Sequence, residues 1–164
     1  MGVIIVTGTP GTGKTTLAKK LSKKLDFHYL DANEIIKEYD ISEGYDKKRD
    51  TNIIDTKKLN LALIKEINNH KKIENGIIID SHLSHYLPRR HVDVCIVTKC
   101  DLKELENRLR NKKYSKSKIR ENMDAEIFDI CLSEAKERGH KVLVVDTTKG
   151  INIDNISRKV GDSL

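Results

Sequence analysis

The stretch GTPGTGKT (Gly8–Thr15) decides the fold of this chain. It fits the G-x-x-x-x-G-K-[ST] pattern at every fixed position. The β-branched run Val3–Val6 precedes it and predicts a buried strand, while Leu17, Leu21 and Leu25 follow it at helical spacing. Strand, glycine loop and helix therefore occur in the order that a phosphate-binding loop requires.

The glycines of this loop, among them Gly11 and Gly13, let the backbone curl so that its N–H groups point inward and bind anionic oxygens. The N-terminus of the following helix adds its free N–H groups and its positive dipole end. We expect Lys14 to reach the β- and γ-phosphates of ATP, the Thr15 hydroxyl to ligate Mg²⁺, and Thr16 to bond an α-phosphate oxygen. The alternative is a glycine-rich turn that binds nothing, and the complete pattern in its strand–helix context favours the phosphate site.

A second polar residue of interest ends the apolar run Gly76–Ile79. Three consecutive isoleucines indicate a strand buried on both faces, and Asp80 stands at its carboxyl end. Beside the glycine loop, Asp80 would hold Mg²⁺ directly or through water; otherwise it would cap the next turn. If the chain stayed extended, His82 would point the same way as Asp80. Spacing alone, however, favours a loop histidine bonded to a backbone carbonyl.

The order of the apolar runs predicts an α/β fold. Five apolar strands alternate with helices, so we expect one domain, residues 1–164, with a five-stranded parallel sheet and helices on both faces. The ligand then belongs at the carboxyl edge of the strands. Asp31 and Asn33 stand where a helix cap is wanted. We expect residues 42–55 to be loop-like and Ile119–Arg138 to form one long helix.

A basic run, residues 110–118, shows no apolar periodicity. Such a run is usually a solvated face. Phosphoryl transfer nevertheless needs cations over the transferring group, commonly from a segment that closes late. Arg108 and Lys112 are spaced i, i+4, so one helix face would aim both at the phosphates of ATP.

The composition bounds the class of protein. The chain has 164 residues, three cysteines without C-x-x-C spacing, and no apolar stretch long enough to span a membrane. We expect reduced thiols in a soluble, cytoplasmic protein that is a monomer or a weak oligomer. The net charge of +6 suits nucleotide or RNA binding, or the salt-bridged surface of a heat-adapted protein. The second is favoured, because aromatic residues make up only 4% of the chain.

Several motifs point to a known family when they are taken together. They are the loop up to Thr16, Gly44-Tyr45-Asp46 with Asp50 and Asp55, Asp80-Ser81-His82, Arg108-Leu109, Tyr114, and Asn122 with Ala125-Glu126-Ile127. Between about Val3 and about Ala135 the chain resembles the isoenzyme-six type of adenylate kinase, small nucleotide kinases also described as ribosome-assembly ATPases. The loop alone suits many folds, whereas the Asp-x-His motif with the later ones is more specific.

The resemblance implies a three-layer P-loop fold of the nucleoside-monophosphate-kinase type. It implies transfer of the γ-phosphoryl group of ATP to AMP-like acceptors, with Mg²⁺, and some ATP hydrolysis. Residues 31–54 would form the acceptor-binding segment, with Asp31, Asn33 and Lys37 at the monophosphate. Residues 111–121 would form a short lid over ATP.

The resemblance also implies roles for single residues. Lys14, Asp80, His82 and Arg108 would be catalytic, with Asp80 serving the metal and His82 linked to catalysis or to coupling motion with hydrolysis. Lys112 would bind ATP from the lid. The family also acts late in small-ribosomal-subunit assembly and rRNA maturation, through a ribosomal protein of the uS11 type, which such a resemblance makes an expected partner here.

Two lysines depart from the family pattern. The family often has arginine where this chain has Lys37 and Lys112. A lysine offers one point charge in place of a planar fork, so bidentate phosphate binding is in doubt at both positions. Slow turnover or relaxed acceptor choice would follow.

Three functions are therefore compared. The first is a Mg²⁺-dependent nucleoside monophosphate kinase that acts by positioning and charge neutralisation. The second is an assembly switch, in which ATP binding and slow hydrolysis regulate docking on a ribosomal protein. The third is a kinase of a small metabolite such as shikimate or gluconate, which the lack of the arginines expected for a carboxylate substrate disfavours.

Overall fold

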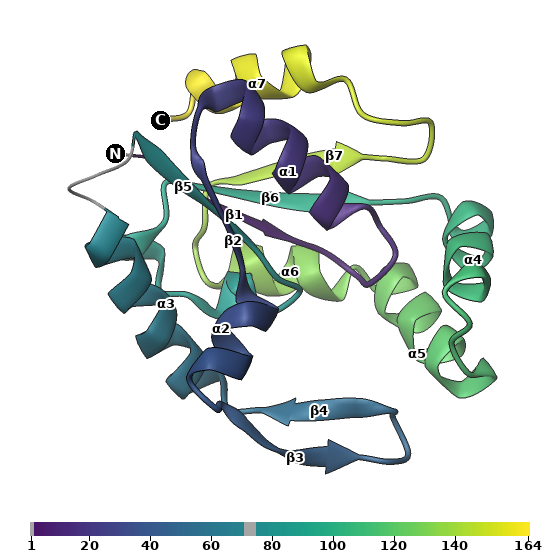
Figure 1. The fold of residues 1–164 in the computed structure, drawn as a ribbon. Coiled ribbons are helices and arrows are strands. Elements are labelled where there is room, and N and C mark those ends of the chain that lie inside the picture. Colours follow the sequence, from purple (N-terminus) through teal and green to yellow (C-terminus); the bar gives the residue numbers. More distant parts are fainter. Residues whose placement is uncertain (1, 71–74) are drawn as a thin grey trace.

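The computed structural model describes residues 2–70 and 75–164. Its centre is a five-stranded sheet in the order β2-β5-β1-β6-β7, and every pair of neighbouring strands in it is parallel (Figure 1). The predicted α/β fold with a five-stranded parallel sheet is therefore confirmed. The strands are β1 (Gly2–Thr7), β2 (His28–Asp31), β5 (Gly76–Asp80), β6 (Val94–Lys99) and β7 (Val142–Asp146).

Helices cover both faces of this sheet, as Figure 1 shows. α1 and α7 lie on one face, and α2, α3 and α6 lie on the other. α4 and α5 pack on each other beside the carboxyl edge. The helices are α1 (Lys14–Leu25), α2 (Ala32–Glu38), α3 (Thr56–His70), α4 (Leu102–Asn111), α5 (Lys116–Ile127), α6 (Ile130–Glu137) and α7 (Ile153–Gly161).

The central strand β1 is buried on both faces because its side chains alternate between two apolar clusters. Val3 and Ile5 pack in the cluster of α2, α3 and α6, whereas Ile4 and Val6 pack in the cluster of α1 and α7. Ile4 pairs with Ile78 of β5 on one side and with Val94 of β6 on the other. The chain leaves β1 between these two neighbours, which is the crevice where open parallel sheets bind their ligands.

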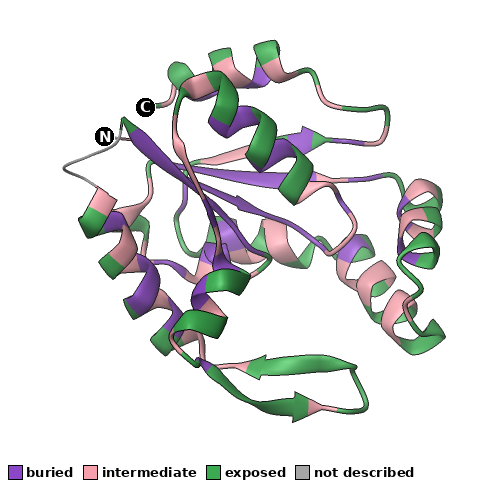
Figure 2. Ribbon diagram, in the orientation of Figure 1, coloured by how far each residue is buried: buried purple, intermediate pink, exposed green. Residues whose placement is uncertain are grey.

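The loop-like expectation for residues 42–55 is wrong. The segment forms an antiparallel hairpin of β3 (Ser42–Asp46) and β4 (Thr51–Ile54), which projects away from the sheet (Figure 1). Most of its residues are exposed (Figure 2), so the apolar pattern that marks a half-buried strand is weak here. The backbone ladder and a register shift between Ser42 and Gly44 shape this hairpin.

The single long helix expected over Ile119–Arg138 is also wrong. The chain breaks into α5 and α6 at Asp129, whose φ of 52° is left-handed. Lys99 forms ion pairs with the carboxylates of Asp129 and Glu126 at this break. α5 packs against α4 while α6 packs against the sheet, and one straight helix cannot reach both.

Within the ranges 2–70 and 75–164, no helix combines the length and the apolar character that a membrane span requires.

Candidate active site at the carboxyl edge of the sheet

The glycine loop leaves β1 and curls before α1 begins at Lys14. Gly8, Gly11 and Gly13 have φ values of +142°, +92° and +89°, which residues with a side chain rarely adopt. A Cβ on Gly8 would lie 2.4 Å from Thr98 Oγ1, so the close approach of the loop to β6 requires glycine here. Gly13, Lys14, Thr15 and Thr16 line the crevice, so the N-terminus of α1, where the free N–H groups of a helix lie, opens onto it.

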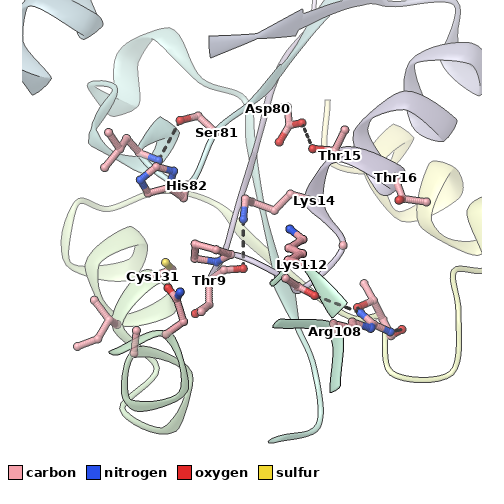
Figure 3. A pocket seen from close by; sticks show the side chains of 18 of the residues that line it. Thr9, Lys14, Thr15, Thr16, Asp80, Ser81, His82, Arg108, Lys112 and Cys131 are labelled. Carbon is pink, nitrogen blue, oxygen red and sulfur yellow. Dashed lines mark hydrogen bonds between the residues drawn. The ribbon is translucent and has the colours of Figure 1, made fainter. Parts of the chain in front are cut away.

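Lys14 lies inside this curl (Figure 3). Its Nζ donates hydrogen bonds to the carbonyls of Gly8 at 2.8 Å and Thr9 at 3.1 Å. Burial lowers the pKa of Lys14 to about 8, because the surrounding protein desolvates the ammonium group. An anion beside it would favour the charged form, so this lysine is placed to respond to a phosphate.

Thr15 and Asp80 meet at the carboxyl edge, as their positions in the sequence predict. Thr15 Oγ1 donates a hydrogen bond of 2.6 Å to Asp80 Oδ2, and Tyr29 OH donates another of 3.0 Å to the same oxygen. Burial and the Asp80 carboxylate raise the pKa of Tyr29, so the phenol remains a donor. A hydroxyl beside a buried carboxylate is the oxygen donor set that Mg²⁺ prefers, and these two residues fit the metal.

His82 also lines the crevice, but not on an extended chain. β5 ends at Asp80, the chain turns, and a 3-10 helix, η1 (Ser84–Tyr86), follows. The His82 side chain is exposed within the crevice, and the pKa of its imidazole is lowered to about 4. The main cause is desolvation of the charged ring by the neighbouring walls, followed by repulsion from Lys14. The ring is therefore a neutral hydrogen-bonding group facing the phosphate loop (Figure 3).

Arg108 and Lys112 both lie on the α4 wall of the crevice. The Arg108 guanidinium binds protein oxygens: Nη1 donates to Thr147 Oγ1 at 3.1 Å, Nη2 to Thr147 O at 2.9 Å, and Nε to Glu104 at 2.8 Å. Arg108 therefore ties α4 to the segment after β7, and its role in catalysis stays a prediction. Lys112 has no such bonds among the described contacts and lies near the Tyr114 ring, 5.9 Å from its centroid.

Of the three residues expected at the monophosphate, one lines the crevice and two do not. Asn33, on α2, lines the crevice. Asp31 is the N-cap of α2, and its carboxylate accepts a hydrogen bond of 2.8 Å from Asn33 N–H. Lys37 is exposed and does not line the crevice. Contacts of Asp31 and Lys37 with an acceptor stay predictions.

Several residues that sequence reasoning missed also line the crevice. Arg49 and Thr51 come from the hairpin, Lys118 from α5 and Cys131 from α6. The hairpin tip reaches α5, because Lys118 Nζ donates to Asp50 O at 2.8 Å and Arg49 lies 3.4 Å from Glu121. Arg49 and Thr51 fall in the acceptor-binding segment that the family resemblance implies, residues 31–54, and Lys118 falls in the implied lid, residues 111–121, although none of the three was singled out. No sequence signal pointed to Cys131. The crevice therefore runs from the glycine loop to the hairpin, with a volume of about 980 Å³.

Comparison with known proteins identifies the family. A family model described as "AAA domain" matches residues 4–129. "Adenylate kinase isoenzyme 6 homolog FAP7" of Saccharomyces cerevisiae is 37% identical over 161 residues, which cover 96% of this chain and 79% of that protein. "Adenylate kinase isoenzyme 6 homolog" of Caenorhabditis elegans is 34% identical over 134 residues, which cover 82% and 72%. This chain belongs to the adenylate kinase isoenzyme 6 family. The resemblance expected from its motifs is confirmed.

Solved structures agree with this family at the level of the fold. "Structure of deoxyadenosine kinase from M.mycoides with bound dATP" matches with a TM-score of 0.61 at 18% identity, covering 98% of this chain and all of the other. "Shikimate kinase from Acinetobacter baumannii in complex with shikimate" also has a TM-score of 0.61, at 14% identity, with 99% and 92% covered. The fold is thus that of P-loop kinases, and membership of the isoenzyme 6 family makes the chain a phosphotransferase.

Proposed function

We propose that the protein transfers the γ-phosphoryl group of ATP to a nucleoside monophosphate of the AMP type. One observation carries this proposal. A single crevice of about 980 Å³ joins the phosphate loop to the segment made by α2 and the β3–β4 hairpin. This volume is at the upper end of small-molecule sites, as room for a donor and an acceptor requires.

The positive groups along this crevice lie where phosphates would meet. Lys14 stands at the loop, Lys112 and Lys118 on the side of α4 and α5, and Arg49 on the hairpin. In-line transfer between two bound phosphates needs positioning and charge neutralisation and no covalent intermediate. The loop N–H groups would hold the triphosphate of ATP, and the hairpin would hold the acceptor on the opposite side.

Thr15 and Asp80 are the residues that would hold Mg²⁺, since their oxygens lie 2.6 Å apart at the edge of the sheet. When bound, the ion supplies positive charge that screens the phosphate oxygens. Tyr29 orients the Asp80 carboxylate by donating to Oδ2. Burial of Asp80 beside α1 keeps this carboxylate fixed while substrates enter.

The kinase proposal is tested by incubating purified protein with ATP, Mg²⁺ and AMP and following ADP. Lys14→Ala should lower the rate by on the order of 10² or more, because the cation nearest the loop is lost. Its thermal transition should remain. Lys23→Ala, an exposed lysine on the same helix, is the control and should behave as wild type. If AMP does not raise ADP formation by the wild type above the background of ATP hydrolysis, the proposal is contradicted.

We also infer a second activity, slow ATP hydrolysis that serves maturation of the small ribosomal subunit through a uS11-type protein. The neutral His82 ring beside Lys14 supports it, because such a ring can accept a hydrogen bond from an attacking water. The resemblance of Asp80-Ser81-His82 to the family motif points the same way. We further propose that the protein acts in the cytoplasm.

Two measurements test the second activity. His82→Gly should reduce ATP hydrolysis more than ATP affinity, and equal loss of both would make His82 a structural residue. Binding to a purified uS11-type protein should differ between the ATP-bound and ADP-bound states. Binding that is the same in both states would leave the kinase proposal intact and remove the switch.

A further inference from the structure

A histidine in the wall of the crevice is buried in the middle of a series of hydrogen-bonded side chains. His85, on η1, is 1% exposed. Its Nδ1 lies 2.8 Å from Thr7 Oγ1, and its Nε2 lies 2.7 Å from Glu134 Oε2. The three residues come from the end of β1, the segment after β5 and helix α6, so the ring joins three separate parts of the fold.

The partners of the ring define its protonation. Glu134 offers a carboxylate oxygen, which accepts hydrogen bonds, so Nε2 carries the proton. Burial lowers the pKa of His85, and the ring is therefore neutral at pH 7. Its Nδ1 then carries a lone pair, and the Thr7 hydroxyl donates to it.

Thr7 connects this ring to the turn that carries His82. The Thr7 hydroxyl also lies 3.3 Å from the carbonyl oxygen of His82, so its hydrogen is shared between two acceptors. Further bonds hold the same turn against β1, since Ser81 N–H and the Ser84 hydroxyl both donate to Val6 O at 3.2 Å. The backbone at His82 is thereby tied to the strand that leads into the phosphate loop.

At its other end, the series of hydrogen bonds from Thr7 through His85 reaches Glu134, which also lines the crevice. The Glu134 carboxylate accepts a hydrogen bond from Tyr86 OH at 3.2 Å, and Arg138 lies 4.2 Å from the centre of the Tyr86 ring. Glu134 and Tyr86 both line the crevice. α6 is thus fixed against η1 by two side chains of the segment that follows Asp80.

We propose that His85 is a positioning residue, which holds the His82 turn at the phosphate loop through the Thr7 hydroxyl. In this role His85 acts through the Thr7 hydroxyl and the His82 turn. This role rests on the proposed function, because His82 matters only if phosphates bind opposite it. The Thr7 contact carries the role, whereas the Glu134 contact anchors the ring to α6.

Two substitutions of His85 separate its contacts. An asparagine places its side-chain oxygen near Nδ1 and keeps an acceptor for Thr7, while a glutamine reaches the place of Nε2 and keeps a donor to Glu134. We expect His85→Asn to keep kcat within about threefold of wild type. We expect His85→Gln to lower kcat about tenfold or more with little change in KM for ATP, the fold-change of one lost hydrogen bond. His70→Gln, outside the crevice, is the control.

Thr7 gives a second test that does not depend on the stability of the His85 variants. Thr7→Val is nearly isosteric and removes the hydroxyl, so it should lower kcat as His85→Gln does. Thr7→Ser keeps the hydroxyl and should restore kcat. Amide hydrogen exchange of residues 82–86 should accelerate in Thr7→Val and His85→Gln but not in Thr7→Ser.

The outcomes are distinct. The role of His85 is overturned if His85→Gln is active while His85→Asn is inactive. It is also overturned if Thr7→Val keeps the kcat and the amide exchange rates of the wild type. Equal loss in all variants that follows their thermal stability also overturns it, because a merely structural residue behaves so. Accelerated exchange in a protein whose wild type makes no ADP from AMP would overturn the proposed function and leave the tie between Thr7, His85 and the turn in place.

Discussion

The planar guanidinium group of Arg108 gives a prediction that separates the effect of its positive charge from the effect of its geometry. Its guanidinium reaches two oxygens of Thr147, at 3.1 and 2.9 Å, and its side chain is 27% exposed. Arg108→Lys keeps the charge, but an ammonium group replaces the planar fork and holds at most one of these oxygens. The variant therefore loses at least one hydrogen bond from a charged donor.

Such a bond contributes about 1.5 to 3 kcal/mol, whereas the partly exposed pair with Glu104 contributes only about 0.3 to 0.5 kcal/mol. In a chain of this length the loss lowers Tm by roughly 3 to 12 °C. The segment from Thr147 to Ile151 lines the crevice beside the loop, so its loosening should also raise KM for ATP about tenfold, with kcat within about threefold.

Thermal melting and the coupled ADP assay on Arg108→Lys measure both effects. Arg110→Lys is the matched control, because Arg110 lies on the same helix, is 67% exposed and pairs only with Glu106 among the described contacts. The reasoning is refuted if Arg108→Lys melts as wild type does and loses kcat instead. In that case the guanidinium would act on the reacting phosphates, as the family resemblance implies.

Two further predictions concern the loop and the buried histidines. Gly8→Ala should lower the free energy of unfolding by about 2 kcal/mol or more and abolish ATP binding in calorimetry, because the new Cβ meets Thr98 at a φ of +142°. The control is Gly161→Ala, which should leave the free energy of unfolding unchanged or raise it, because nothing lies within 4 Å of its Cβ. Equal behaviour of the two variants would contradict this prediction. His140 is buried, its Nε2–H donates a hydrogen bond of 3.0 Å to His85 O, and burial lowers its pKa. The unfolded chain then binds more protons below pH about 6.5, so stability falls with falling pH by up to about 1.4 kcal/mol per pH unit for each such histidine. His140→Gln should flatten a plot of Tm against pH between pH 7.5 and 5, and a curve parallel to that of wild type would refute it.

The prediction of the fold succeeded where neighbouring residues share one environment. β1 and β5 are runs of β-branched residues buried on both faces, so a few adjacent residues suffice to show each strand. The hairpin of residues 42–54 lacked this signal because its side chains are mostly exposed and backbone pairing holds it. The break at Asp129 was missed for another reason, since α5 and α6 pack on different partners that the local sequence does not name.

In the candidate site, too, some contacts could be expected from the sequence and others could not. Asp80 and Thr15 were expected together because parallel strands bring their carboxyl ends to one edge, and their oxygens lie 2.6 Å apart. Arg108 was expected to point at phosphates, which stays a prediction, whereas its hydrogen bonds to Thr147, a residue 39 positions away, were not expected. Spacing on one helix cannot show which oxygens a distant loop will present to that helix.

The sequence by itself determined the phosphate loop, the parallel sheet and the edge at which Lys14, Thr15 and Asp80 gather, because glycine conformation and strand burial are properties of adjacent residues. Only the tertiary structure decided that Arg108 holds the wall of the crevice and that the hairpin reaches α5. It also decided that His85 lies between Thr7 and Glu134. These contacts join residues tens of positions apart, and they form only when separate elements pack around the sheet.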